Sequence, residues 1–239
     1  MIRGLGTRSR ERLEAAVRDG GRFRSVRDLV ARSGLDRRGL RLLAEAGALD
    51  AFVPDEPVLR RRRAAVWRLL EAVRGDAGPL APQAPSPDVP AAVPTMRPPE
   101  LTEADYRATG VSLAGHPMRH LREILLPNGV RTAREIRGLR DGQPVAVAGL
   151  VICRQRPGTA KGFVFLTLED ETGTVNVVVT PKRFERQALL ISRAPLLLVR
   201  GVLQVEGAPP TVVVNVRAAS FHGLEMTSGA EYARGHDFH

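Results

Sequence analysis

The stretch Phe163-Val164-Phe165-Leu166-Thr167-Leu168-Glu169-Asp170-Glu171-Thr172-Gly173-Thr174-Val175-Asn176-Val177-Val178-Val179-Thr180 decides the fold of the second half of this chain. Its side chains alternate with period two, which predicts β-strands at 163–168 and 174–180. Between them, Glu171-Thr172-Gly173 fits a tight turn. The stretch is therefore predicted to be a β-hairpin.

Further strand-like runs flank this hairpin. They cover 145–155, 196–205 and 211–219, and a helical stretch covers 182–191. Five strands with one helix between the third and the fourth is the order of an OB barrel. We therefore expect a five-stranded OB-fold domain at 139–222, followed by a tail at 223–239.

The first 75 residues predict short helices instead. Gly4-Leu5-Gly6 leads into one helix, Ser25 can cap a second, and Ser33-Gly34-Leu35-Asp36 joins the second to a third. This pattern is typical of helix-hairpin-helix motifs, in which free backbone N–H groups at a helix start bind a DNA phosphate. The predicted residues that bind duplex phosphates are Gly4, Gly6, Gly34, Arg37 and Arg38. The alternative is that these glycines only cap and turn the helices.

A proline-rich stretch separates the two halves. Eight of the 18 prolines lie between Gly75 and Glu100, which predicts an extended linker at 76–100. A helical connector is expected at 101–138. The predicted class is thus α+β, with an all-α unit at 1–75, a linker, a connector and a barrel.

Charge narrows the choice of partner. The formal net charge is +10, and residues 1–75 hold 18 basic and 10 acidic side chains. Such a balance favours a polyanion such as nucleic acid. The chain has no apolar run long enough to span a bilayer, so no membrane partner and a cytoplasmic location are expected. In a helix, the four consecutive arginines at 60–63 would point in different directions around its axis. They are therefore expected to be either a solvated helix start or a non-specific contact with phosphates.

The predicted hairpin also suggests a site for single strands. Alternation places Val164, Leu166 and Leu168 in the core and the two phenylalanines outside, where bases can stack on them. The predicted single-strand site comprises Arg154, Arg156, Lys161, Phe163, Phe165 and Asn176. The alternative is that the linker or the segment 101–135 covers the phenylalanines.

No catalytic set is apparent in the sequence. The acidic cluster Glu169-Asp170-Glu171 falls at the predicted hairpin turn, and the histidines lack metal-ligand spacing. The single cysteine, Cys153, excludes an internal disulfide. We expect no catalytic residue, no metal, no cofactor and no small-molecule substrate.

Several motifs, in this order, resemble the tandem helix-hairpin-helix and OB region of bacterial C-family DNA polymerases. They lie at 2–6, 23–29, 43–50, 106–117 and 158–173. The segments 154–162 and 235–239 are most similar to the error-prone paralogue of the polymerase III alpha subunit. The resemblance implies a part of an enzyme for translesion synthesis, DNA repair and replication, with the hairpins on duplex DNA and the barrel on single-stranded template.

The resemblance also implies that the catalytic part of the family is not among these residues. The family's palm, whose aspartates bind Mg²⁺, lies upstream of the matching region, so this chain alone is expected to be inactive as a polymerase. The first hairpin is expected to be truncated, because the helix before Gly4 would precede Met1. The alternative function is a protein-docking module that recruits a sliding clamp or an accessory translesion polymerase.

Overall fold

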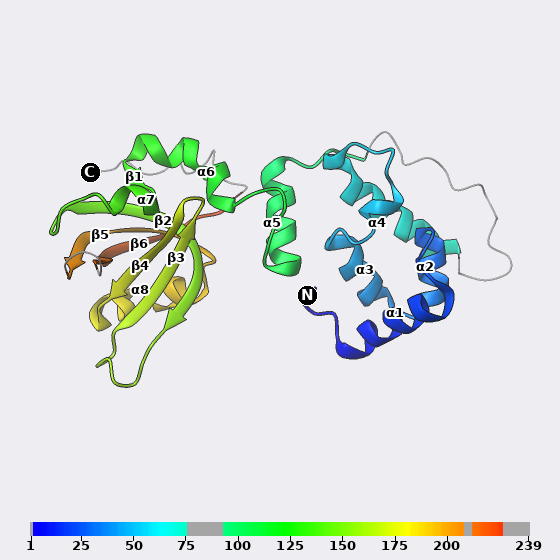
Figure 1. Cartoon of the computed structure of the whole chain (residues 1–239), viewed down its shortest axis with the longest axis horizontal. Helices are drawn as coiled ribbons and strands as arrows, with labels where there is room; N and C mark the ends of the chain where they lie inside the picture. The colour runs from blue at the N-terminus through cyan, green and yellow to red at the C-terminus, as the bar shows by residue number, and fades with distance from the viewer. Residues whose placement is uncertain (1, 76–92, 208–211, 227–239) are drawn as a thin grey trace. The chain divides into compact units, whose positions relative to one another are not determined.

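The computed structural model describes residues 2–75, 93–207 and 212–226. The chain divides into two compact units, Met1–Ala114 and Gly115–His239, which are drawn in Figure 1. Most of the predicted linker and the predicted tail beyond residue 226 lie outside the described residues. In the ranges above, no helix is both long and apolar enough to cross a membrane.

The first unit is built from helices, as the sequence predicts. They are α1 (Thr7–Gly20), α2 (Val26–Ser33), α3 (Arg37–Glu45), the 3-10 turn η1 (Asp50–Phe52), α4 (Val58–Gly75) and α5 (Pro98–Thr109). Ser25 caps α2 as expected, because its hydroxyl accepts from the N–H of Asp28 at 3.1 Å. The core is aliphatic and includes Val26, Leu29, Leu40, Leu43, Leu49, Val53 and Leu69.

The chain reversal after α3 depends on a glycine and a buried arginine. Gly47 has a φ of +79°, and a Cβ there would collide with the guanidinium of Arg62. Arg62 is only 8% exposed. It donates to the carbonyl of Glu45 at 2.7 Å and to the carboxylates of Asp50 and Asp105 at 3.2 and 2.9 Å. One side chain on α4 thus joins the end of α3, η1 and α5.

The predicted connector does not form one element. Residues 98–100, assigned to the linker, make the first turn of α5. Just before them, Met96 is buried and donates its N–H to the carbonyl of Leu59 at 2.8 Å. Helix α5 and the residues after it through Ala114 belong to the first unit, whereas the connector from Gly115 onward belongs to the second. Contacts between residues far apart in the sequence, such as that of Asp105 on α5 with Arg62 on α4, decide this division, and no local pattern displays them.

The second unit is the predicted OB barrel with a helical layer added. Its elements are α6 (Pro117–Leu125), the 3-10 turn η2 (Leu126–Asn128), β1 (Val130–Arg131), α7 (Ala133–Ile136), β2 (Pro144–Gln155), β3 (Val164–Asp170), β4 (Gly173–Val179), α8 (Pro181–Arg193), β5 (Leu196–Glu206) and β6 (Val213–Gly223). The strand order is β1-β2-β3-β4-β6-β5, and a further β2–β5 pairing closes five of the strands into a barrel (Figure 1). This topology confirms the predicted OB fold and the α+β class.

Apolar residues fill the barrel and also coat part of its outside. The interior includes Val147, Leu166, Leu168, Val177, Leu197, Leu203, Val216 and Phe221. Outside β2 and β5, α6 packs Met118, Leu121 and Leu125 on a second apolar layer. Leu224 and Met226, assigned to the tail, are buried in this layer. The segment after β6 is therefore part of the folded unit through residue 226.

A buried carboxylate fixes the β3–β4 hairpin. Asp170, 5% exposed, accepts from both the N–H and the hydroxyl of Thr172 at 2.7 Å and from the N–H of Gly173 at 3.1 Å. Its other oxygen accepts from the N–H of Ala133, at the start of α7, at 2.7 Å, and pairs with Arg122 of α6 at 3.3 Å. The acidic cluster is thus a structural turn, and its contacts tie the hairpin to α6 and α7.

Replacing Arg62 by Ala is expected to lower the free energy of unfolding of the first unit by about 3 kcal/mol, because two carboxylates lose a buried partner. Urea denaturation followed by Trp67 fluorescence measures this, since Trp67 is the single tryptophan and lies in α4. The control is Arg41→Ala, whose side chain is 77% exposed beside Glu45, with an expected change of at most about 0.5 kcal/mol. Equal effects of the two variants would contradict the role of Arg62.

Replacing Asp170 by Ala is expected to accelerate hydrogen exchange of the β3 and β4 amides, because buried donors at the turn lose their acceptor at a cost of about 1–3 kcal/mol each. Mass spectrometry of peptides from 164–179 measures the exchange. Glu169→Ala, one residue away on the outer face, serves as the control and should leave the exchange unchanged. Equal exchange in the two variants would show that the hairpin does not depend on Asp170.

Candidate nucleic-acid interface

The outer face of β3 and β4 is the centre of the candidate site. Val164, Leu166 and Leu168 are buried in the barrel, as the alternation predicts, and Phe165 is 38% exposed on the opposite face. Phe165 lies opposite Gln155 of β2 and Val178 of β4. An exposed aromatic ring on a sheet face is a surface on which a nucleic-acid base can stack.

Phe163 and Asn176 lie close to this ring along the sheet. Phe163 is half-buried and comes directly before β3, at the end of the loop 156–163. Asn176 is exposed on β4, opposite Thr167, two residues along the strand from the partner of Phe165. The structure therefore places Phe165 and Asn176 on one face and Phe163 at the edge of that face.

Arg154 is committed to the fold. Its guanidinium donates to the carbonyls of Ile191 and Ala194, at 2.9 and 2.5 Å, and so satisfies the C-terminal end of α8. Burial lowers the pKa of Arg154 below its ordinary value. A side chain in this position stabilises the barrel and is not available to follow a phosphate chain.

Arg156 and Lys161 lie in the loop between β2 and β3. The guanidinium of Arg156 sits 5.0 Å from the centre of the Phe184 ring on α8, and the contact leaves its N–H groups without a hydrogen bond to the described residues. Lys161 and Gly162 have φ of +47° and +84°, and Phe163 donates its N–H to the carbonyl of Ala160 at 2.9 Å. This tight turn exposes the Lys161 side chain. Both cations can therefore contact phosphates.

Sequence reasoning missed the contribution of β6 to this face. β6 runs parallel to β4, with Asn215 beside Asn176 and Arg217 beside Val178. Arg217 is exposed, and Asn215 is half-buried. The alternation from Val213 to Arg217 signals an outer face, but it does not name β4 as the neighbour. The parallel pairing joins strands on either side of α8, which local patterns cannot reveal.

The first unit offers a second candidate contact, at the start of α1. Gly4 has a φ of +79°, and Gly6 is the N-cap of α1 with no side-chain hydrogen bond to the helix start. The carbonyl of Gly6 accepts from the N–H groups of Ser9 and Arg10. A capping position without a side chain leaves room for an anion near the first N–H groups of the helix.

The turn at Gly34 is arranged differently. Gly34 ends α2 with a φ of +59°, and its carbonyl accepts from Arg12 at 2.6 Å. Asp36 caps α3, because its carboxylate accepts from the N–H of Gly39 at 2.7 Å. Arg37 and Arg38 are exposed next to this cap. A carboxylate thus occupies the helix start at which we expected a phosphate, so the two arginines are the cations that this turn offers.

The four consecutive arginines of α4 hold the unit together. Arg60 pairs with Glu56 at 3.4 Å, and Arg61 donates to the carbonyls of Glu56 and Pro54. Arg62 has the buried contacts described above. Arg63 pairs with Glu100 at 3.2 Å and donates to the carbonyls of Pro94 and Thr95. The run is neither a solvated helix start nor a free phosphate contact.

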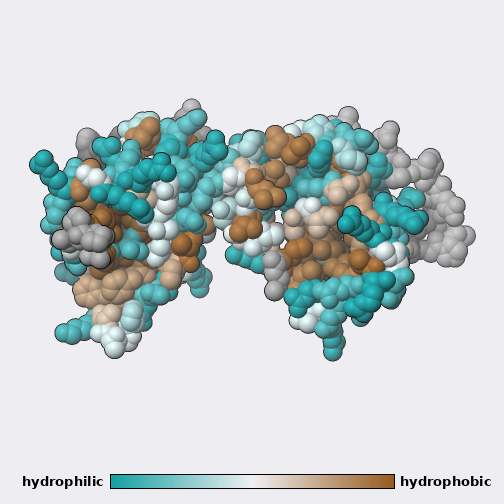
Figure 2. Space-filling model, in the orientation of Figure 1, coloured by the Kyte–Doolittle hydropathy of each residue, from teal (hydrophilic) through white to brown (hydrophobic). Residues whose placement is uncertain are grey.

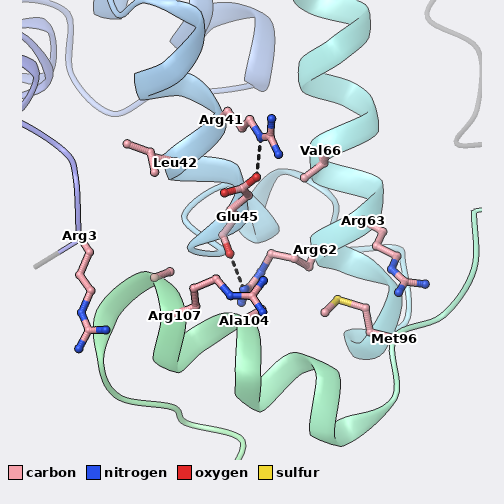
Figure 3. A pocket seen from close by; sticks show the side chains of 11 residues that line it. Arg3, Arg41, Leu42, Glu45, Arg62, Arg63, Val66, Met96, Ala104 and Arg107 are labelled. Atoms are coloured by element: carbon pink, nitrogen blue, oxygen red, sulfur yellow. Dashed lines mark hydrogen bonds and ion pairs between the residues drawn. The ribbon is translucent and has the colours of Figure 1, made fainter. Parts of the chain in front are cut away.

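A hollow of about 590 Å³ opens between α3, α4 and α5 (Figure 3). Its apolar wall includes Leu42, Val66, Met96, Ala104 and Ala108. Arg41 pairs with Glu45 at 2.6 Å at its rim, and Arg107 pairs with Glu103 at 2.6 Å. Figure 2 shows apolar areas bordered by hydrophilic groups on the side of the chain that it draws. Carboxylates on the protein already offset most of the arginine charge here.

The described part of the chain contains no group of three His, Cys, Asp or Glu side chains that could hold a metal ion. Asp170 and Glu171, the acidic residues of the hairpin turn, both pair with Arg122, at 3.3 and 2.6 Å. These carboxylates therefore stabilise the fold.

Two protein-family matches fall on the two parts of the chain, one on the helical first unit and one on the barrel. Residues 1–61 match a helix-hairpin-helix motif, and residues 145–218 match an OB-fold nucleic acid binding domain. Among solved structures, asparaginyl-tRNA synthetase from Pyrococcus horikoshii is 23% identical over 39% of this chain and 22% of that chain, with a TM-score of 0.33.

Whole-chain relatives are error-prone DNA polymerases. The chain is 45% identical to the one from Anaeromyxobacter dehalogenans over 238 residues, which is 100% of this chain and 20% of that protein. It is 41% identical to the one from Pseudomonas fluorescens over 87% of this chain and 19% of that protein. The chain thus spans about a fifth of the length of the relatives it matches. Over its whole length the chain is thus similar to a part of the error-prone DNA polymerases, and its two domain matches are a helix-hairpin-helix motif and an OB-fold nucleic acid binding domain.

Proposed function

We propose that this chain binds DNA for an error-prone polymerase that acts in translesion synthesis. In this proposal the helix-hairpin-helix unit holds duplex DNA and the OB barrel holds the single-stranded template. The observation that carries it is the outer face of β3, where exposed Phe165 lies opposite Gln155, next to the loop that carries Arg156 and Lys161, in a fold that matches nucleic-acid binding domains. Both units supply binding, and catalysis is assigned to other parts of such a polymerase.

The two units would bind DNA by different means. At the start of α1, backbone N–H groups contact a phosphate whatever the base sequence. On the barrel, an aromatic ring contacts bases, and cations at one edge of the face contact phosphates. Such a division suits a junction at which a duplex continues into an unpaired strand.

Fluorescence anisotropy of the whole chain tests the proposal with duplex, primer-template and single-stranded DNA at several salt concentrations. We expect salt-dependent binding to all three, because each mode includes phosphate contacts. Absence of salt-dependent binding to any of them would refute the proposal. A clamp or accessory polymerase that is retained at high salt, without DNA binding, would favour the docking alternative.

Replacing both Phe163 and Phe165 by Ala is expected to weaken single-strand binding at least about fivefold, because base stacking on an aromatic ring contributes roughly 1–3 kcal/mol per base. The slope of log affinity against log salt should stay unchanged, since no phosphate contact is lost. Duplex binding by the same variant provides the internal control. Unchanged single-strand affinity would show that the ring face is not used.

Replacing both Arg156 and Lys161 by Ala is expected to reduce the salt slope for single strands by about 1.4, because each lost phosphate contact changes it by about 0.7. Arg154→Ala is the matched control from the same segment. It should lower the melting temperature, because the end of α8 loses its hydrogen bonds, and it should leave the slope of the folded protein unchanged. A larger slope change for Arg154→Ala than for the double variant would contradict these assignments.

A further inference from the structure

The register of the barrel places a line of polar residues across its outer face. Thr167 of β3 lies opposite Cys153 of β2 on one side and Asn176 of β4 on the other. Asn176 lies beside Asn215 of β6, and Asn215 lies opposite Gln204 of β5. We call Thr167, Asn176, Asn215 and Gln204 the polar row. Its members are spaced roughly 4.8 Å apart, the distance between neighbouring strands.

The rows on either side of the polar row differ in charge. On one side, Phe165, Val178 and Arg217 lie abreast, next to the loop that carries Arg156 and Lys161. On the other side, Glu169 lies opposite Thr174, and Glu206 lies opposite Val213. The face therefore changes from basic to acidic across the polar row. A phosphate chain is attracted to the side of Arg217 and repelled from the side of Glu169 and Glu206.

The polar row does not serve the sheet itself. No side chain of Thr167, Asn176, Asn215 or Gln204 makes a hydrogen bond to the residues that the structure describes. Asparagine is also unfavourable in β-strands, where β-branched residues are preferred. The two asparagines nevertheless lie side by side at the centre of the face. Their amide groups are thus free to bind a ligand.

We infer that the polar row forms hydrogen bonds with the base edges of the bound single strand, which rests on the proposed single-strand binding. An amide offers an acceptor beside donors, a match for a base edge that presents a donor beside an acceptor, such as that of adenine. In a single strand such edges are not occupied by a complementary base. With phosphates toward Arg217 and one base on Phe165, base edges meet Asn176 and Asn215. The barrel then distinguishes bases and does more than hold the backbone.

The test compares two oligonucleotides that differ only in a central tract, of deoxyadenosine or of nitroindole, a ring that stacks but lacks a hydrogen-bonding edge. Binding of a thymidine oligonucleotide tests whether the chain binds single strands at all, independently of the inferred base preference. The wild-type chain should bind the deoxyadenosine tract at least about fivefold more tightly than the nitroindole tract. Asn176→Ala with Asn215→Ala should abolish this preference, and Thr174→Ala, on the same face of β4, should retain it.

The outcomes separate the inference from the proposed function. Wild-type binding to the thymidine oligonucleotide without preference for deoxyadenosine over nitroindole would overturn the inference alone, as would a preference that persists in the double variant. No binding to any single strand would overturn both. If the alanine double variant does not fold, Asn176→Val with Asn215→Val replaces it, because valine is favoured in strands and lacks the amide.

Discussion

The register of the β3–β4 hairpin is the constraint on which the candidate site depends. A slip of one residue would turn Phe165 into the barrel and Leu166 out of it, because side chains alternate along a strand. Asp170 opposes such a slip: it accepts from Thr172 and Gly173 within the turn and from Ala133 outside it. The same carboxylate therefore closes the turn and anchors it to the helical layer. The chemistry of the outer face follows from a buried contact at the end of the hairpin.

Much of the fold could be predicted because it is encoded locally. Period-two alternation located the strands that became β2 to β6, and Ser25 marked the start of α2. The division of the connector could not be predicted. Whether α5 joins the first unit depends on Asp105 meeting Arg62, which lies 43 positions away. The short strand β1 was also missed, since it exists only because Val130 pairs with Ala146 of β2. Contacts of this kind leave no periodic signal in the sequence.

The candidate site was predictable in part. Alternation was enough to place Phe165 outside and to put Asn176 on the same face. It could not show that Asn215 lies beside Asn176, because a parallel pairing across α8 must first exist. It also could not distinguish Arg154 from Arg156. These two arginines are separated by one residue, yet one donates to the end of α8 and the other lies over the ring of Phe184. The position of α8 decides which of them remains free for a ligand.

The formal charge of +10 overstates the number of cations that are available to bind DNA phosphates. Arg60 to Arg63, the densest basic run, pair with carboxylates or donate to carbonyls within the first unit. An arginine paired with a carboxylate releases fewer counterions from DNA, because its charge is already compensated on the protein, whereas Arg61, bonded only to carbonyls among the described residues, keeps its net charge. In the proposed single-strand binding, cations with no such partner, such as Arg156 and Arg217, would contribute in full. The slope of log affinity against log salt would therefore report how many uncompensated cations contact the phosphates of the strand. If the proposed site uses only Arg156, Lys161 and Arg217, contacts with bases would have to supply a correspondingly larger share of the affinity.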